Sequence, residues 1–149
     1  MKTNKSPASA RLRKGRLSIP GQIYLVTTTT HKRERCFDDF EAGCALCRSL
    51  HRLEALERVT NLSFVAMPDH LHWLFALGDQ QDLSAVVRMA KSYSGRALGR
   101  SIWQPGFRDR AIRREADVLP AARYIVANPL RAGLVRSVRY YPFWYAAWL

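Results

Sequence analysis

Two histidines separated by one residue lie in an apolar run directly after Met67-Pro68-Asp69. Side chains in a β-strand alternate between its two faces, so His70 and His72 share one face of a predicted strand. Leu71 and Trp73 belong to the opposite face. Two neutral imidazoles held side by side supply half of a divalent-metal site, which a ligand from elsewhere must complete. The pair is also compatible with inert, hydrogen-bonded histidines on a wettable sheet face, because two ligands are an incomplete set.

The charge of the chain is strongly positive and unevenly distributed. The 149 residues carry 24 Lys and Arg against 12 Asp and Glu, a net charge of +12. Residues 1–35 hold nine positive and one negative charge, residues 36–82 hold three and eight, and residues 83–149 hold twelve and three. Two basic flanks therefore enclose an acidic middle. Such a field attracts polyanions, of which nucleic acid is the commonest, and the alternatives are an anionic membrane surface or a generally basic, solubilising surface.

Length and composition exclude several classes of protein. A chain of this length is expected to form one domain with a single core. No stretch approaches the roughly 18 apolar residues of a membrane span, and the basic N-terminal segment lacks the apolar run of a signal peptide. Three cysteines, an odd number, favour a reducing cytoplasm. Cys44, Cys47 and His51 could share one helix face, but no second ligand pair follows them, so a metal site there is disfavoured.

Residues 1–20 are predicted to form a basic N-terminal arm, and residues 21–149 a folded domain. The arm contains no acidic residue and few large apolar residues, so it cannot fold alone. It is either a disordered tail or a segment that becomes ordered on phosphates. Its candidate DNA-binding residues are Arg11, Arg13, Lys14 and Arg16.

The order of the predicted elements indicates the fold class. The predicted elements are a strand at 23–30, a helix at 40–58 capped by Asp38 or Asp39, a strand at 61–67, the histidine strand, a helix at 83–98 between Asp82 and Gly99, a strand or irregular hairpin at 102–112 with a turn at Pro105-Gly106, and a helix at 116–127. The short break at Pro68-Asp69 predicts that the two strands around it are antiparallel neighbours. This order predicts an α+β sandwich, with an antiparallel sheet and helices packed against it.

The predicted helix at 116–127 places a tyrosine away from its apolar face. The apolar face is formed by Val118, Ala122, Ile125 and Val126. Tyr124 projects from the opposite side, whereas a tyrosine that fills a core normally lies within the apolar stripe. Asn128, at i+4, points the same way, and its amide oxygen is a candidate metal ligand. A surface tyrosine beside a helix-ending Asn128-Pro129 is the alternative interpretation.

The chain resembles the REP-associated tyrosine transposases of bacteria in two joined motifs. The first is His-x-His after Met-Pro-Asp, and the second is the downstream run Tyr124-Ile125-Val126-Ala127-Asn128-Pro129-Leu130-Arg131-Ala132-Gly133-Leu134-Val135. The resemblance also includes the stretch from Trp103 to Ile112 and the aromatic end from Tyr141 to Trp148. It implies a metal-dependent single-stranded-DNA endonuclease and strand transferase of the HUH superfamily, related to the transposases of single-strand insertion sequences.

The resemblance also implies roles for individual residues. His70 and His72 match the metal-binding pair, Tyr124 the nucleophile that forms a 5′-phosphotyrosine, and Asn128 the amide ligand. Two imidazole nitrogens and an amide oxygen suit Mg²⁺ or Mn²⁺. In that family the sheet is ferredoxin-like, the tyrosine helix lies across it, and the substrate is a palindromic DNA hairpin flanked by a short guide sequence.

Further candidate phosphate contacts come from the second half of the chain. They are Arg88, Lys91, Arg108, Arg110, Arg113 and Arg114, each of which is otherwise a solvated surface charge. The expected partner is DNA rather than a membrane, the expected location is the cytoplasm in association with the nucleoid, and the expected state is a monomer or a homodimer. Two alternatives remain, a non-catalytic hairpin-binding protein derived from a transposase and an RNA-binding module, although the latter usually displays aromatic residues where this chain has histidines.

Overall fold

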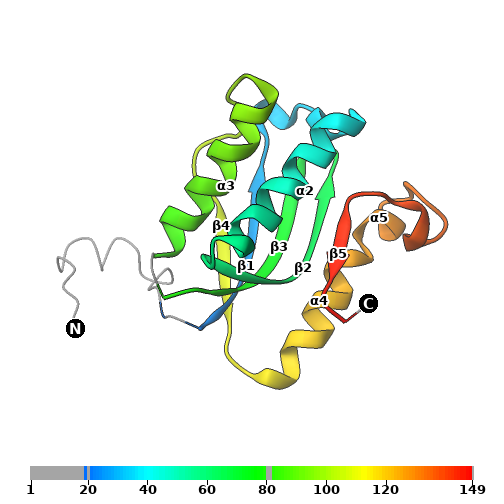
Figure 1. The fold of residues 1–149 in the computed structure, drawn as a ribbon. Coiled ribbons are helices and arrows are strands. Elements are labelled where there is room, and N and C mark those ends of the chain that lie inside the picture. The colour runs from blue at the N-terminus through cyan, green and yellow to red at the C-terminus, as the bar shows by residue number, and fades with distance from the viewer. Residues whose placement is uncertain (1–18, 20, 80–81, 149) are drawn as a thin grey trace.

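The fold is built on one antiparallel sheet of five strands in the order β4-β1-β3-β2-β5 (Figure 1). The computed structural model describes residues 19, 21–79 and 82–148. The strands are β1 (Ile23–Thr29), β2 (Val59–Met67), β3 (His70–Leu77), β4 (Arg108–Ile112) and β5 (Trp144–Ala146). The histidine strand β3 is the central strand, with β1 and β2 as its neighbours.

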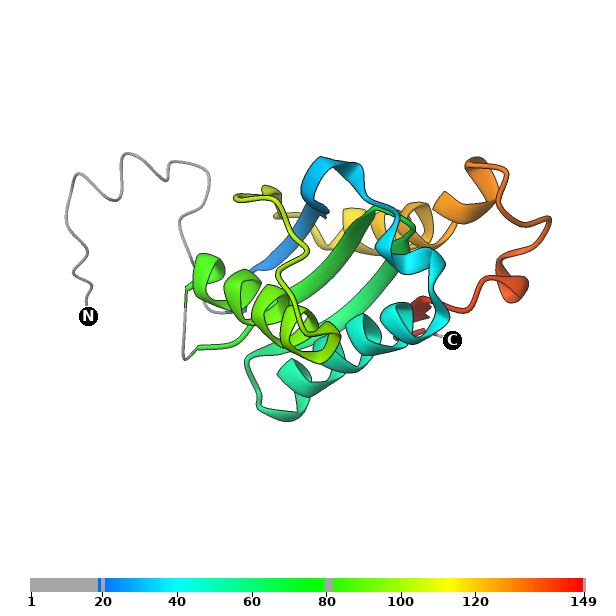
Figure 2. The ribbon, with the colours of Figure 1, turned by 90° about the horizontal axis from the view of Figure 1, so that it is seen from above.

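Helices cover both faces of this sheet. Helices α2 (Phe40–Ala55) and α3 (Leu83–Leu98) pack on one face, while α4 (Val118–Val126) and the short α5 (Asn128–Arg131) lie on the other (Figure 2). Apart from two short 3-10 helices after β1, the chain runs β1-α2-β2-β3-α3-β4, which is the ferredoxin-like order. The predicted α+β class, with an antiparallel ferredoxin-like sheet and helices packed against it, is therefore confirmed.

The ends of the two long helices follow from their capping residues. The side chain of Asp39 accepts a hydrogen bond from the backbone N–H of Ala42 and begins α2, and Asp82 does the same for Ala85 at the start of α3. Gly99 ends α3 with φ 76°, a left-handed conformation that glycine adopts without strain.

The core lies between the sheet and the pair α2 and α3. Leu71, Trp73, Phe75 and Leu77 alternate along β3 and are buried on this side. The indole N–H of Trp73 donates to Asn61 Oδ1 at 2.7 Å, and Asn61 Nδ2 donates to the carbonyl of Leu50 in α2 at 3.0 Å. Since both polar groups are satisfied, the largest buried side chain can sit in the core and tie the helix to two strands.

Three features differ from the sequence-based prediction. For the segment 102–112 the hairpin alternative is wrong and the strand alternative holds for its second half, because Trp103 forms a single bridge to Thr30 and β4 then pairs with β1. The Asn128-Pro129 pair does not end the helical region but begins α5, since proline lacks only the N–H that a first helical turn leaves unpaired. Strand β5 pairs with β2 and was not predicted.

The predicted basic arm lies outside the described residues, apart from Ile19. In the part of the chain that the structure describes, no helix combines the length and the apolar character that crossing a membrane requires.

Candidate active site

The two histidines project together from the face of β3 that α4 partly covers. Their ring centroids lie 4.8 Å apart, and the ring planes are nearly perpendicular at 88°. The residues that alternate with them, Leu71 and Trp73, are buried in the core on the opposite face. The predicted convergence of His70 and His72 is therefore present, and it follows from strand alternation alone.

Each imidazole is held through its Nδ1 atom. His70 Nδ1 lies 2.7 Å from Asp69 Oδ1, and His72 Nδ1 lies 3.1 Å from Thr27 Oγ1 on β1. Asp69 also accepts a hydrogen bond from Arg33 Nε at 2.9 Å. When the Nδ1 atoms donate to these oxygens, the Nε2 lone pairs are free to bind a ligand, as in metal sites with a carboxylate behind the histidine.

The electrostatic environment keeps the second histidine neutral. Burial, followed by the positive charges of His70, Arg131 and Arg108, lowers the pKa of His72 to about 4. The neutral imidazole is the form that binds metal ions. Burial opposes ionisation of Asp69, but the hydrogen bonds from His70 and Arg33 outweigh it, so the pKa of this carboxyl is lowered.

Two arginines extend the histidine face across the sheet. In the register of the strands His72 lies opposite Thr27, and Thr27 lies opposite Arg108 on the edge strand β4. Directly opposite residues share a face, so Arg108 and, two residues along, Arg110 lie on the histidine face. Both are exposed. These two predicted DNA-binding residues therefore lie beside the histidine pair.

Helix α4 carries Tyr124 over the histidine face of the sheet. Val118, Ala122 and Ile125 are buried against the sheet. Ser63 on β2 donates its hydroxyl to the carbonyl of Ala122 at 3.2 Å, which fixes the helix on this strand. Tyr124 is 63% exposed, as predicted from its position off the apolar stripe.

Arg131 in α5 holds the tyrosine from two directions. Its guanidinium carbon lies 3.6 Å from the centroid of the Tyr124 ring, which is a cation–π contact, and its Nη2 donates to the Tyr124 carbonyl at 2.8 Å. The same charge contributes to the lowered pKa of His72. Arg131 thus contacts the tyrosine and, through its charge, favours the neutral form of His72.

The donor set fits a divalent cation if an amide oxygen completes it. Within the described ranges, no group of three or more His, Cys, Asp or Glu side chains is placed to hold a metal. Asn128 donates its Nδ2 to the carbonyl of Ile125 at 3.0 Å, which orients the amide and leaves Oδ1 as an acceptor. His70, His72 and Asn128 are thus the residues whose chemistry suits an ion such as Mg²⁺ or Mn²⁺.

The cysteine-rich face of α2 has a different environment. The ring of His51 packs at 5.4 Å from Phe64 and 5.2 Å from Tyr145. Burial raises the pKa of the Cys47 thiol to about 12, so it remains a protonated, poor metal ligand.

The remaining predicted DNA-binding residues lie elsewhere. Arg88 and Lys91 project from α3, and Arg113 and Arg114 follow β4 as exposed side chains, with Arg114 Nε 3.9 Å from Asp117 Oδ2. Arg11, Arg13, Lys14 and Arg16 lie outside the described residues.

Three residues of the site had no predicted role: Thr27, Asp69 and Arg131. Asp69 directly precedes His70, and a carboxylate beside a candidate metal-binding histidine is a signal that sequence alone offers. Arg131 lies beyond the predicted end of the tyrosine helix, so helical spacing could not place it beside Tyr124 until α5 was known. Thr27 could not be found without the register of β1 on β3, which is set by the whole sheet.

Comparison with known proteins identifies the family. The family model described as "Transposase IS200 like" matches residues 19–125. A REP-associated tyrosine transposase of Escherichia coli strain K12 is 37% identical over 84 residues, which is 54% of this chain and 50% of that protein. The chain therefore matches about half the length of this curated relative.

Solved structures agree with this assignment. A REP-associated tyrosine transposase bound to a REP hairpin superposes with a TM-score of 0.75 at 27% identity, covering 87% of this chain and 79% of the other. A transposase-like protein from Deinococcus radiodurans R1, described as putative, gives a TM-score of 0.54 at 21% identity, with 75% and 94% covered, and supports the fold alone. The resemblance predicted from the two motifs is confirmed, and the chain belongs to the IS200-like transposase family.

Proposed function

We propose that this chain is a metal-dependent single-stranded-DNA endonuclease and strand transferase that recognises palindromic DNA hairpins and cleaves them through a 5′-phosphotyrosine intermediate. The observation that carries the proposal is the placement of Tyr124. Its side chain is 63% exposed on a helix that packs on the histidine face of the sheet. The guanidinium of Arg131 stacks on its ring and also contributes to the lowered pKa of His72. A tyrosine that only filled space would not need this environment.

The substrate class follows from charge and from the solved relative. Arg108 and Arg110 lie on the histidine face, and the chain as a whole carries +12 charges, so a polyanion is attracted to this side. The relative with a TM-score of 0.75 was solved with a REP hairpin. Hairpin DNA with a single-stranded flank is therefore the proposed substrate, and a DNA-binding protein of this kind would associate with the nucleoid.

His70, His72 and Asn128 would hold the divalent metal, Mg²⁺ or Mn²⁺. When bound, such an ion neutralises charge on a non-bridging phosphate oxygen. The residues behind the site then have defined tasks. Asp69 and Thr27 fix the two imidazoles through their Nδ1 atoms, so that both Nε2 atoms are presented together.

Tyr124 is the proposed nucleophile. Its phenolic oxygen attacks the scissile phosphorus, the bond from phosphorus to the 3′-oxygen breaks, and the phenolic proton passes, directly or through solvent, to that oxygen. One fragment then carries a 5′-phosphotyrosine and the other a free 3′-hydroxyl. Because the diester is conserved, another 3′-hydroxyl can attack it and join new ends without ATP. Arg131 orients the ring, and Arg108 binds a phosphate of the same strand.

The test is cleavage of end-labelled single-stranded DNA from palindromes that flank the gene for this chain. Cleavage should occur with Mn²⁺ or Mg²⁺ and should stop in EDTA, while hairpin binding should persist because phosphate contacts dominate it. His72→Ala should behave as wild type does in EDTA. The matched control is His51→Ala, because this histidine lies on α2, which packs on the opposite face of the sheet.

Other outcomes would refute this proposal. Full cleavage by His72→Ala in chelator would contradict the metal site. Binding of several hairpins without cleavage in either metal would favour a non-catalytic hairpin-binding protein, and preferential binding of RNA would favour an RNA-binding module.

A further inference from the structure

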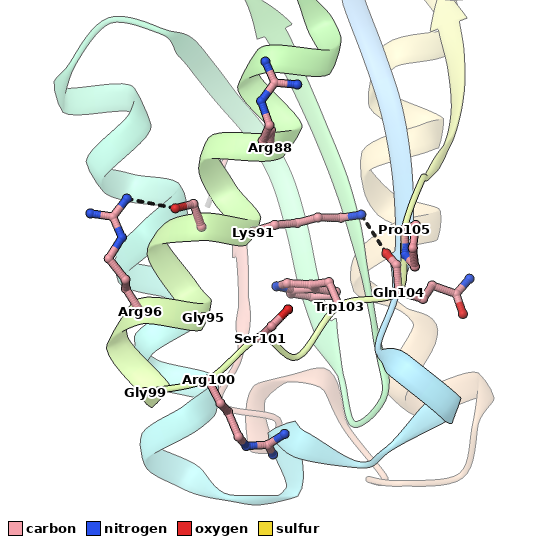
Figure 3. A pocket seen from close by; sticks show the side chains of 11 residues that line it. Arg88, Lys91, Gly95, Arg96, Gly99, Arg100, Ser101, Trp103, Gln104 and Pro105 are labelled. Carbon is pink, nitrogen blue, oxygen red and sulfur yellow. Dashed lines mark hydrogen bonds between the residues drawn. The ribbon is translucent and has the colours of Figure 1, made fainter.

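A basic groove lies between α3 and the segment 99–106 that leads to β4 (Figure 3). It has a volume of about 660 Å³, within the range of ligand-binding sites. Four cationic side chains line it, and no Asp or Glu is among the described residues that do so. They are Arg88, Lys91, Arg96 and Arg100. The groove is therefore suited to an anion.

The four cations differ in how much of their charge is free. Lys91 Nζ donates to the carbonyl of Gln104 at 3.0 Å (Figure 3) and to that of Gly106 at 2.6 Å, so it fastens the segment to α3 and forms part of the wall. Arg100 forms an ion pair with Glu34 at 2.8 Å. These two charges are already used by the protein itself.

Arg88 and Arg96 remain for a ligand. Both are exposed on α3. Arg88 has no hydrogen bond or ion pair with any residue that the structure describes. Arg96 donates only to the neutral hydroxyl of Ser92, at 2.8 Å, and lies 5.8 Å from the ring centroid of Tyr93. The two residues are eight positions apart on α3, about 12 Å along the helix, so their uncompensated guanidinium groups can contact separate phosphates of one strand.

Trp103 gives the groove an aromatic surface of fixed orientation. Its indole N–H donates to Ser94 Oγ at 2.9 Å, and its ring packs against Phe37 with a centroid distance of 5.6 Å. The side chain is only half-buried and lines the groove. An immobilised indole beside arginines is a stacking surface for a nucleobase, and such stacking tolerates any base.

The groove lies on the α3 side of the sheet (Figure 2), whereas the histidines lie on the other face, but one wall of the groove reaches the histidine end of β1. The N–H of Gln104 donates to the carbonyl of Thr29 at 3.0 Å, and Thr29 lies opposite His70 in the register of β1 on β3. With neighbouring strands about 4.8 Å apart, Gln104 lies about 10 Å from the histidine strand. A polynucleotide held at the histidines therefore reaches the groove by passing around this end of the sheet.

We infer that the basic groove binds the single-stranded DNA that flanks the scissile phosphate, with a base stacked on Trp103 and phosphates on Arg88 and Arg96. The identity of the strand rests on the proposed function, whereas binding in the groove does not require cleavage. The groove thereby extends the contact between protein and DNA beyond the hairpin.

The test measures binding of a fluorescent oligothymidylate of about 12 nucleotides by fluorescence anisotropy at several salt concentrations. Arg88→Ala and Arg96→Ala should each reduce the slope of log K against log salt by about 0.7, because each removes one phosphate contact. Arg139→Ala removes the same charge from an exposed residue shortly before β5, the edge strand opposite to β4, and should leave the slope unchanged. Trp103→Leu should lower the affinity about tenfold, and Trp103→Phe should restore most of it.

A photoreactive thymidine analogue in the same oligonucleotide should crosslink to the peptide that contains Trp103. Thermal unfolding identifies any Trp103 variant that fails to fold, and the two arginine variants keep the inference testable in that case. If both arginine variants bind oligothymidylate with the salt slope and affinity of wild type, the inference that the groove binds DNA is wrong. So would equal affinity for a single thymidine nucleotide, or tighter binding of oligouridylate.

Failure of the groove and failure of the proposed function can be told apart. Oligothymidylate binding is measured with Tyr124→Phe in EDTA, where no cleavage is possible. If wild type cleaves no hairpin but Arg88→Ala and Arg96→Ala reduce the salt slope as expected, only the proposed nuclease activity is refuted. Normal cleavage with unaltered binding by Arg88→Ala and Arg96→Ala would refute only the groove.

Discussion

Replacing Arg131 by alanine removes the cation–π contact that orients the ring of the proposed nucleophile. The hydrogen bond at 2.8 Å goes to the backbone carbonyl of Tyr124, so it positions the guanidinium and not the ring. The cation–π contact at 3.6 Å is exposed and contributes about 0.5–1 kcal/mol of preference for one ring position. If cleavage requires that position, kcat should fall about 2- to 5-fold.

The assay is single-turnover cleavage of a labelled hairpin, with binding measured separately. Binding should weaken by no more than one phosphate contact, and the thermal midpoint should change little because Arg131 lies on the surface. Arg131→Lys keeps the charge without the planar group and should recover part of the rate. Arg136→Ala, an exposed arginine in the same region of the chain, is the matched control.

Three results would refute this reasoning. An unchanged kcat in Arg131→Ala would show that the contacts do not matter for catalysis. A loss confined to KM would make Arg131 a phosphate contact only. A faster reaction would mean that Arg131 holds Tyr124 away from its working position.

Three further predictions address the support of the site, the fold and the N-terminal segment. Asp69→Asn removes the carboxylate behind His70 and should raise the Mn²⁺ concentration needed for half-maximal cleavage about 10- to 100-fold; an unchanged requirement would contradict its role. Tyr141 donates to the Ala66 carbonyl at 2.6 Å, so Tyr141→Phe should lower the free energy of unfolding in urea by about 1–3 kcal/mol. Burial, followed by the electrostatic effects of Asp38 and Cys47, raises the pKa of Tyr141 from 10.0 to about 12. Wild type should therefore lose the stability contributed by this hydrogen bond as the pH rises from about 10 to 12. A difference in stability between wild type and Tyr141→Phe that does not change with pH would contradict this prediction. Deleting residues 1–16 should flatten the salt dependence of hairpin binding, and an unaltered slope would show that the arm makes no phosphate contacts.

Local sequence signals predicted the elements and the faces of the central strand. Alternation along β3 put His70 and His72 on one side, and Asp39 and Asp82 marked the helix starts through the same capping hydrogen bond. The helical projection put Tyr124 off the apolar stripe, where it is 63% exposed. Each of these depends on residues close together in sequence, which is why the sequence sufficed.

Features that depend on pairing between distant segments were not predictable. The row from His72 through Thr27 to Arg108 exists only because β1 pairs with both β3 and β4 in one register. Strand β5 has only three residues, too few for a periodic signal, and it is ordered by pairing with β2. The segment 102–112 contains turn residues that suggested a hairpin, but both of its ends pair with β1, and Lys91 holds the bend between them.

The most direct test of the central claim is the covalent adduct itself. Wild-type protein incubated with Mn²⁺ and a labelled hairpin should form a protein–DNA species that survives boiling in detergent, and peptide mapping should place the DNA on Tyr124. Tyr124→Phe keeps the ring and should bind DNA but form no adduct, whereas Tyr140→Phe, which alters a comparably exposed tyrosine, should behave as wild type. An adduct on another tyrosine, or metal-dependent cleavage without any adduct, would contradict the account.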